Sequence, residues 1–249
     1  MLFEEKKIQL NIQRASKQFS DTDRFLYRWA EDKIKERLKD IKREFKNIKI
    51  ISDFPIHIEN AQAGNKPPYD CVISIFNLHR TNTPEEQLRQ IHKSLKPDGM
   101  FLGLFFGDAT LTELKQSLTK TEINLSNGSH QRVQPFMSKQ QVGALMQSSN
   151  FALPVIDSEY VLVDYTKINT LYTDLRAMGE TNSLTTRSKK PVPKIFFDNL
   201  EKQYAKDFSS KDKFTATYEV IFCTGWTPDE SQQKPLRPGS GKTSLKDVL

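Results

Sequence analysis

The sequence predicts an α/β fold with a mainly parallel sheet and helices on both of its faces. Residues 69–76 and 100–106 are almost entirely apolar, as expected for strands that are buried on both sides. Residues 83–95, between them, have a proline and two acids at their start and an apolar period typical of a helix. A strand–helix–strand unit of this kind implies parallel strands joined by a right-handed crossover. Residues 214–224 alternate β-branched and aromatic side chains, which predicts a last strand running antiparallel to the others.

The remaining elements are predicted from the same helical and strand periodicities of apolar residues. Ser20-Asp21 offers an N-cap for an amphipathic helix of about 25 residues, in which apolar side chains recur at three- and four-residue steps from Phe25 to Phe45. Residues 48–51 predict a short buried strand, and residues 56–68 a loop. Further helices are expected at residues 110–125, 138–150, 168–178 and 195–208, with a strand within residues 152–165. We expect a single domain over residues 1–228, with an N-terminal helical region at 1–46 and a tail rich in Pro, Gly and Ser at 229–249.

Composition favours a soluble globular protein. The 249 residues are 37% hydrophobic with a mean hydropathy of −0.60, and no apolar run approaches the ~20 residues that a membrane span needs. Glu4 and Glu5 argue against a secretory signal and a mitochondrial presequence. We therefore expect a bacterial cytoplasmic protein, or a protein of the mitochondrial matrix if a presequence precedes these residues.

Cys71 and Cys223 lie in apolar runs and predict buried thiols. The four histidines show no ligand spacing, so no metal site is expected.

Positive charge is concentrated near the N-terminus. Residues 1–50 hold 14 Lys and Arg against 9 Asp and Glu, which supplies +5 of the net charge of +6. Two interpretations stay open for this region: a solvated helix face, or a landing surface for an acidic partner that includes Lys33, Lys35 and Lys39. No aromatic-basic motif of a nucleic-acid-binding module is present, so nucleic acid is not an expected partner.

Several short motifs carry a resemblance to a known family. Residues 70–79 (DCVISIFNLH) and 95–107 (LKPDGMFLGLFFG) resemble the fourth and fifth strands of class I S-adenosylmethionine (SAM) methyltransferases. Residues 111–118, 135–136, 174–182 (DLRAMGETN), 225–228 (GWTP) and 244–247 are similar to the complex I assembly-factor branch of that superfamily. The biotin-pathway malonyl-carrier-protein methyltransferases are a more distant branch. The resemblance covers residues 70–249. It implies a Rossmann-like methyltransferase fold, SAM as cofactor, and a protein or carrier-protein substrate.

The chain departs from this family in its cofactor loop. The family carries D-x-G-x-G-x-G after its first strand, whereas residues 50–56 contain no glycine and the next one is Gly64. Only 16 residues separate Asp53 from Asp70, too few for the two strands and helices that the family has there, so the fold should be truncated. Arg80 also stands where relatives have Trp, which should alter the rim of the pocket. Glycines let a backbone approach a ligand closely. The sequence therefore leaves two hypotheses: a SAM-dependent transferase with an eroded cofactor site, or a pseudo-methyltransferase that has no cofactor and serves as a protein-binding assembly factor.

Candidate site residues follow from the rule that ligands of α/β sheets bind beyond the carboxyl ends of the strands. No catalytic residue can be assigned. Asp53 and Asp108 could equally be turn and N-cap residues, and Asn77 could cap a turn. The string at residues 238–243 lacks the glycine that a phosphate loop needs, because position 236 is Leu. The expected cofactor-binding residues are Asp53, Asn77, His79, Phe106 and Gly107, and the expected substrate-binding residues are Asp108, Glu180 and Asn182.

Overall fold

The predicted α/β fold with a mainly parallel sheet is confirmed. A computed structural model describes residues 1–58, 61, 66–126, 128–210 and 213–233. The sheet has the order β1-β2-β3-β6-β4, in which β1 (Ile48–Ile51), β2 (Tyr69–Ile75) and β3 (Leu95–Phe106) pair in parallel. The antiparallel strand expected near the end is β6 (Lys213–Trp226), which lies between β3 and β4 (Ala152–Tyr165). A two-residue strand, β5 (Ser209–Ser210), pairs with the start of β6.

The truncation expected from the sequence is visible in the sheet. Strand β1 pairs directly with β2, and among the described residues between Ile51 and Tyr69 no further strand is formed. The sheet therefore has the class I methyltransferase arrangement without the two strands that the family places on the far side of β1. The loop of residues 56–68 lies partly outside the described residues, as do the string at 238–243, the motif at 244–247 and most of the predicted tail.

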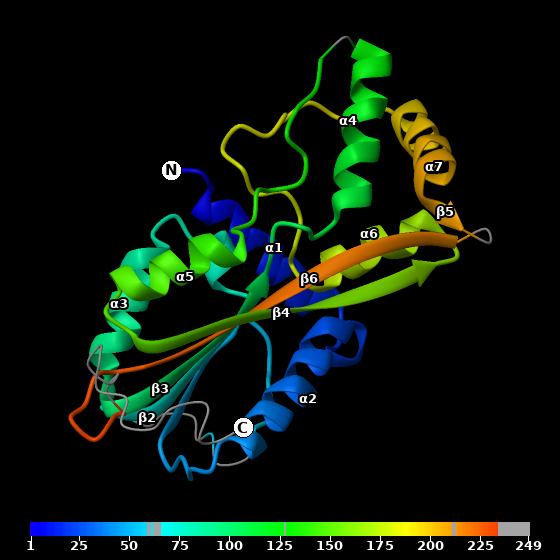
Figure 1. Cartoon of the computed structure of the whole chain (residues 1–249). Coiled ribbons are helices and arrows are strands. Elements are labelled where there is room, and N and C mark those ends of the chain that lie inside the picture. Colours follow the sequence, from blue (N-terminus) through cyan, green and yellow to red (C-terminus); the bar gives the residue numbers. More distant parts are fainter. Residues whose placement is uncertain (59–60, 62–65, 127, 211–212, 234–249) are drawn as a thin grey trace, which may run out of the picture.

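Helices cover both faces of the sheet (Figure 1). One face packs under α3 (Pro84–Ser94) and α5 (Lys139–Ser148), where Leu88 and Met146 meet Phe101 and Phe105 of β3. The opposite face packs against α1 (Glu5–Gln18), α2 (Phe25–Asp40), α6 (Ile168–Ala177) and α7 (Lys194–Phe208). Helix α4 (Thr112–Ser126) lies beside α7, and the pair stands out from the sheet beyond the ends of β3 and β6. None of the helices in the described ranges is long and apolar enough for a membrane span.

The long helix predicted from Ser20 is shorter than expected. Ser20 forms a capping box with Asp23, but this closes only a 3-10 turn, Asp21–Asp23. Arg24 leaves helical geometry because its guanidinium turns inward to the backbone oxygens of Ala15, Phe19 and Ala177. Helix α2 then starts at Phe25 and ends at Asp40 after 16 residues.

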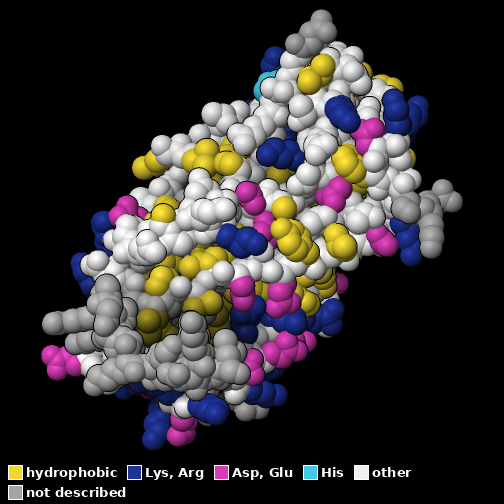
Figure 2. Space-filling model, in the orientation of Figure 1, with side chains coloured by type: hydrophobic (Ala, Val, Ile, Leu, Met, Phe, Trp, Pro, Cys, Tyr) yellow, Lys and Arg dark blue, Asp and Glu magenta, His cyan; other side chains and the backbone are white. Residues whose placement is uncertain are grey.

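The basic face of α2 is occupied within the molecule. Arg37 forms ion pairs with Asp157 and Glu159 of β4, and Lys33 pairs with Glu159 and Glu36. Lys35 pairs with Glu31 one turn earlier. Lys33 and Lys35 therefore have partners within the molecule, whereas Lys39 is exposed, and Figure 2 shows acidic and basic side chains interspersed on the face in view. Both interpretations of this basic region stay open.

Candidate functional site

Four charged or titratable side chains meet at the carboxyl edge of the sheet. Asp53 follows β1, His79 and Arg80 lie on the 3-10 turn Leu78–Arg80 after β2, and Glu180 follows α6. The Arg80 guanidinium forms an ion pair with Asp53 through Nη2, and its Nη1 lies 3.3 Å from Glu180 Oε1. The same Glu180 oxygen is 3.1 Å from His79 Nε2. We call these four residues the Arg80 cluster.

Local backbone geometry places the members of the Arg80 cluster. Gly179 has φ +72°, the left-handed conformation that ends helices, and it terminates α6. The Glu180 amide then donates to the Leu175 carbonyl at 2.8 Å, which turns the Glu180 side chain toward the sheet. In the turn Leu78–Arg80 the Arg80 amide donates a hydrogen bond to the Asn77 carbonyl, so that Arg80 is directed back over the end of β2.

The Arg80 cluster is almost fully enclosed. The side chains of His79, Arg80 and Glu180 are 0%, 4% and 6% exposed, and that of Asp53 is 20% exposed. Burial alone would lower the pKa of Arg80, but Glu180, Tyr27 and Asp53 outweigh it and raise the pKa. Burial alone would likewise raise the pKa of Glu180, yet His79 and Arg80 hold it below the ordinary value. Each charged group of the cluster therefore has an ion-pair or hydrogen-bond partner inside the protein.

Aromatic rings form the floor of the Arg80 cluster. The His79 ring lies 4.9 Å from the Phe106 ring and 5.8 Å from the Phe136 ring, centroid to centroid. Phe106 in turn stacks on Phe76 at 4.7 Å. These apolar neighbours keep water away, which strengthens the ion pairs and makes an unpaired charge costly here.

The other predicted site residues are scattered along the same edge. Asn77 accepts a hydrogen bond from Gln87 of α3 and lines a hollow of about 440 Å³ beside Asp53 and Arg80. The Gly107 amide donates to the Glu219 carbonyl, and a Cβ at Gly107 would collide with the Glu219 carboxylate. Asp108 is exposed in the next turn. Asn182 bonds the Gln131 carbonyl and the Leu184 amide, so it ties two loops together.

The residues present do not fit the family cofactor. The acid expected to bind it, Asp53, is already paired with Arg80. Where the family has glycines that a ligand can approach, Phe54 is 4% exposed, and its ring packs at 5.0 Å from the Tyr27 ring and beneath the Arg24 guanidinium. A buried aromatic side chain fills the space that a glycine loop would leave open. The carboxyl edge of β1 and β2 therefore carries an ion cluster and a buried ring in place of the glycine cradle for SAM, and the hollow at Asn77 lies beside them.

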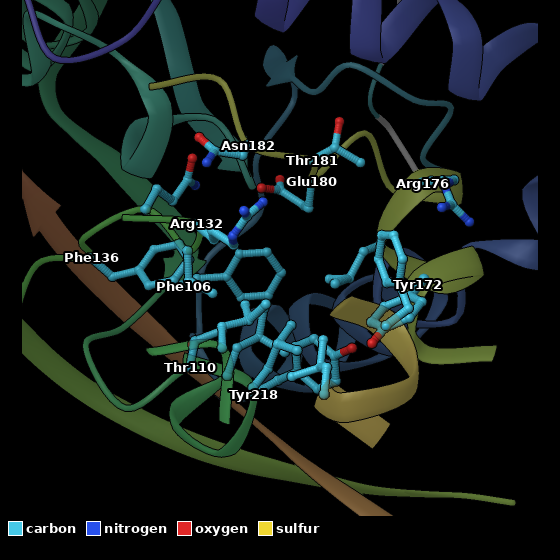
Figure 3. A pocket seen from close by; sticks show the side chains of 18 of the residues that line it. Phe106, Thr110, Arg132, Phe136, Tyr172, Arg176, Glu180, Thr181, Asn182 and Tyr218 are labelled. Carbon is cyan, nitrogen blue, oxygen red and sulfur yellow. The ribbon is translucent and has the colours of Figure 1, made fainter. Parts of the chain in front are cut away.

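A second enclosed space, the α4–α7 cavity, lies on the other side of Glu180. Its volume is about 210 Å³. Figure 3 shows Arg132, Glu180, Thr181 and Asn182 along one side of it, with Phe106, Thr110 and Tyr218 along the other. Most of the remaining wall is apolar and comes from α4, α6 and α7, namely Leu111, Leu114, Leu118, Leu175, Phe196, Phe197 and Leu200.

Sequence reasoning missed the centre of the site. Arg80 was noticed only as a departure at the pocket rim, and the structure buries it instead. The α4–α7 cavity was not foreseen, because its lining residues are ordinary apolar positions of three helices and a loop. The one signal that could have found the cluster was the substitution of an aromatic residue by arginine next to a buried strand. Within the described ranges no three His, Cys, Asp or Glu side chains could hold a metal ion together.

Sequence comparison identifies known proteins that are similar to this chain. It is 34% identical over 181 residues to the mitochondrial arginine-hydroxylase NDUFAF5 of Dictyostelium discoideum, which covers 72% of this chain and 41% of that protein. The human NDUFAF5 is 32% identical over 72% of this chain and 52% of its own length. The chain is a homologue of these NDUFAF5 proteins. It spans about half the length of these relatives.

A more distant relative agrees with the resemblance noted in the sequence. A malonyl-[acyl-carrier protein] O-methyltransferase of Laribacter hongkongensis is 27% identical over 68% of this chain and 55% of that protein. The sequence matches no family model. Among solved structures, the YcgJ protein from Bacillus subtilis aligns with a TM-score of 0.40 at 12% identity over 71% of each chain. A SAM-dependent methyltransferase from Thermotoga maritima aligns with a TM-score of 0.38 at 12% identity, over 82% of this chain and 92% of that one.

Proposed function

We propose that this NDUFAF5 homologue is a pseudo-methyltransferase, a protein-binding assembly factor that works without SAM. The observation that supports this is the Arg80 cluster. It places a guanidinium, paired with Asp53 and Glu180, at the strand ends where the family holds its cofactor. Residues 1–228 would act as one unit in this role.

Charge argues against SAM at this position. The cofactor carries a sulfonium cation, and Arg80 is buried with a raised pKa, so it stays charged. A sulfonium beside this guanidinium would be repelled by it, on the order of 4 kcal/mol at 4 Å for an effective dielectric constant of about 20, and attracted by the two carboxylates with which Arg80 already pairs. Displacing Arg80 to relieve this repulsion would expose two carboxylates without a partner. A bound SAM would have to offset both costs.

Sequence similarity to these relatives supports the proposal of a protein partner. The relatives are named mitochondrial arginine hydroxylases, and the motifs at residues 174–182 and 225–228 resemble those of complex I assembly factors. We propose a protein subunit of an assembling complex as its partner, in the mitochondrial matrix or, for a bacterial chain, in the cytoplasm. The wall of the α4–α7 cavity next to the exposed Phe197 is the proposed contact region.

Calorimetry tests the loss of the cofactor. SAM is titrated into the full chain up to millimolar concentration, with the Arg80→Trp variant as a second sample and a known class I methyltransferase as the positive control. We expect no saturable heat from the unaltered chain, because Arg80 and Phe54 occupy the site. Binding that appears only in Arg80→Trp would show that Arg80 blocks the site. Micromolar binding by the unaltered chain would overturn the proposal and favour a transferase.

Site-specific cross-linking tests the protein partner. A photoreactive phenylalanine analogue is placed at Phe197, which is 44% exposed at the cavity, and in a control at Leu153, which is 52% exposed on β4. We expect the same cross-linked protein in repeated experiments from Phe197 and not from Leu153. If both positions cross-link the same proteins, the contact region is not at the cavity.

A further inference from the structure

The α4–α7 cavity has the form of a small-ligand site. Its volume of about 210 Å³ exceeds the roughly 150 Å³ of an apolar protein cavity that accepts benzene. It therefore has room for an aromatic ring together with a short aliphatic chain. Leu114, Leu175, Phe196 and Leu200 supply an apolar wall of the kind that binds such a group.

Two polar atoms in this wall have no partner in the described part of the chain. Gln134 is 9% exposed, and its Nε2 donates no hydrogen bond. The Tyr172 hydroxyl is also buried and unpaired. Both residues line the cavity. Leaving a buried polar atom unpaired costs about 1–3 kcal/mol. These atoms therefore mark where a polar end of a ligand would be held.

The charged residues around the cavity determine whether the polar group of a ligand should be an anion or a cation. Arg132 donates to Glu122 Oε1 through Nε at 2.8 Å and Nη2 at 2.6 Å, which leaves Nη1 available on the loop that also carries Gln134. Arg176, at the rim, is exposed and makes no ion pair within the described ranges. Among the described residues that line the cavity, Glu180 is the one carboxylate, and it is already bonded to Arg80 and His79. The cavity thus offers the remaining Nη1 donor of the paired Arg132 and the cation of Arg176, and its carboxylate is already occupied.

We propose that the α4–α7 cavity binds an apolar aryl or acyl group that ends in a carboxylate. The apolar body lies between α4, α6 and α7, and the carboxylate accepts hydrogen bonds from Arg132 Nη1 and Gln134 Nε2. Such charge-assisted bonds are the strong ones in proteins. An arginine or lysine side chain is disfavoured by the same donors. The cavity adjoins the proposed protein contact region at Phe197, so the inference deepens the proposed function, but it does not depend on the loss of SAM at the Arg80 cluster.

Paired ligands of opposite charge test this site. 4-Phenylbutyrate and 4-phenylbutylamine share one apolar body, so their binding to the full chain, followed by calorimetry and NMR at neutral pH, isolates the effect of charge. We expect saturable binding of the carboxylate, at least about tenfold tighter than that of the amine. Gln134→Leu and Arg132→Gln should each weaken the carboxylate about tenfold and leave 4-phenylbutanol unchanged.

A cavity-filling variant locates the binding. Leu118 is a half-buried wall residue, so Leu118→Trp should fill the cavity and abolish binding while the thermal midpoint stays near that of the unaltered chain. The tripeptide Gly-Gly-Phe, as free acid and as amide, distinguishes the two sources of the carboxylate: tighter binding of the free peptide than of phenylbutyrate assigns the site to a partner protein, and the reverse assigns it to a small acid. Equal or tighter binding of the amine would overturn the proposal. So would the absence of binding across a series from phenylacetate to phenylhexanoate.

Discussion

Arg80 Nη1 lies 3.3 Å from Glu180 Oε1, and this ion pair joins the end of β2 to the loop after α6 across 100 residues of sequence. Arg80 also holds Asp53 after β1, so three segments that are far apart in the chain meet on one guanidinium. The cluster connects the sheet to the helical part that carries the α4–α7 cavity. It therefore stabilises the molecule at the place where a class I enzyme would open for its cofactor.

Removal of Arg80 should destabilise the protein strongly. Arg80→Ala leaves Glu180 and Asp53 without their cation in a poorly solvated site, which costs about 3–5 kcal/mol for a buried pair. Urea unfolding followed by circular dichroism measures the loss. Arg89→Ala is the control, because the pair of Arg89 with Glu85 is 50% and 46% exposed and should contribute less than about 1 kcal/mol. Equal losses in the two variants would contradict the structural role of Arg80.

Low pH should destabilise the protein by protonating Glu180 in the Arg80 cluster. The pKa of Glu180 lies below its ordinary value of 4.5 because His79 and Arg80 hold the carboxylate, although burial opposes them. A lowered folded-state pKa means that this stabilisation is complete above the ordinary value and is lost as pH falls through the folded value. Glu180→Gln should therefore show a flatter decline of unfolding free energy below pH 4.5 than the unaltered chain. Identical slopes would show that the pKa of Glu180 is the same in the folded and the unfolded chain.

Gly107→Ala should be destabilising for a steric reason. The added Cβ would collide with the Glu219 carboxylate, whose Oε2 accepts from the Ala109 amide in the turn after β3. Overpacking of this kind costs about 1–3 kcal/mol. Gly128→Ala is the matched control, since its Cβ would meet only the Ser126 carbonyl at 4.0 Å. Thermal unfolding of both variants checks the difference, and a neutral Gly107→Ala would mean that Glu219 moves aside freely.

Arg37→Ala should loosen the attachment of α2 to the sheet. Arg37 bonds Asp157 at 2.8 and 3.1 Å, and its guanidinium lies 3.7 Å over the Phe222 ring. Loss of a half-buried, bidentate and stacked arginine costs about 1–2 kcal/mol through packing and charge together. The exposed Lys39 provides the control variant Lys39→Ala, which should change little. A loss in Arg37→Ala that vanishes in high salt would indicate that packing on Phe222 contributes nothing.

The sequence by itself determined most of the framework. The predicted strand at residues 48–51 and the strand within 152–165 coincide with β1 and β4. The helices after β2 end within a few residues of their predicted limits, whereas α2 is shorter than predicted. These predictions succeed because the spacing of apolar residues and the backbone preferences of proline and glycine are local properties of the sequence. The missing glycine loop followed from comparing residues 50–56 with the pattern of the family that the chain resembles, and the sheet pairs β1 with β2 accordingly.

Only the tertiary structure decided how the candidate residues are used. Asp53, His79 and Glu180 are brought together as expected for a site, but Arg80 forms ion pairs with both carboxylates. No local pattern reveals that an arginine beside a strand end will turn inward, since its partners lie 27 and 100 residues away. The α4–α7 cavity likewise arises where helices distant in sequence fail to fill the space between them. Packing of remote segments creates both features, and packing is a property of the folded chain and not of any one stretch of it.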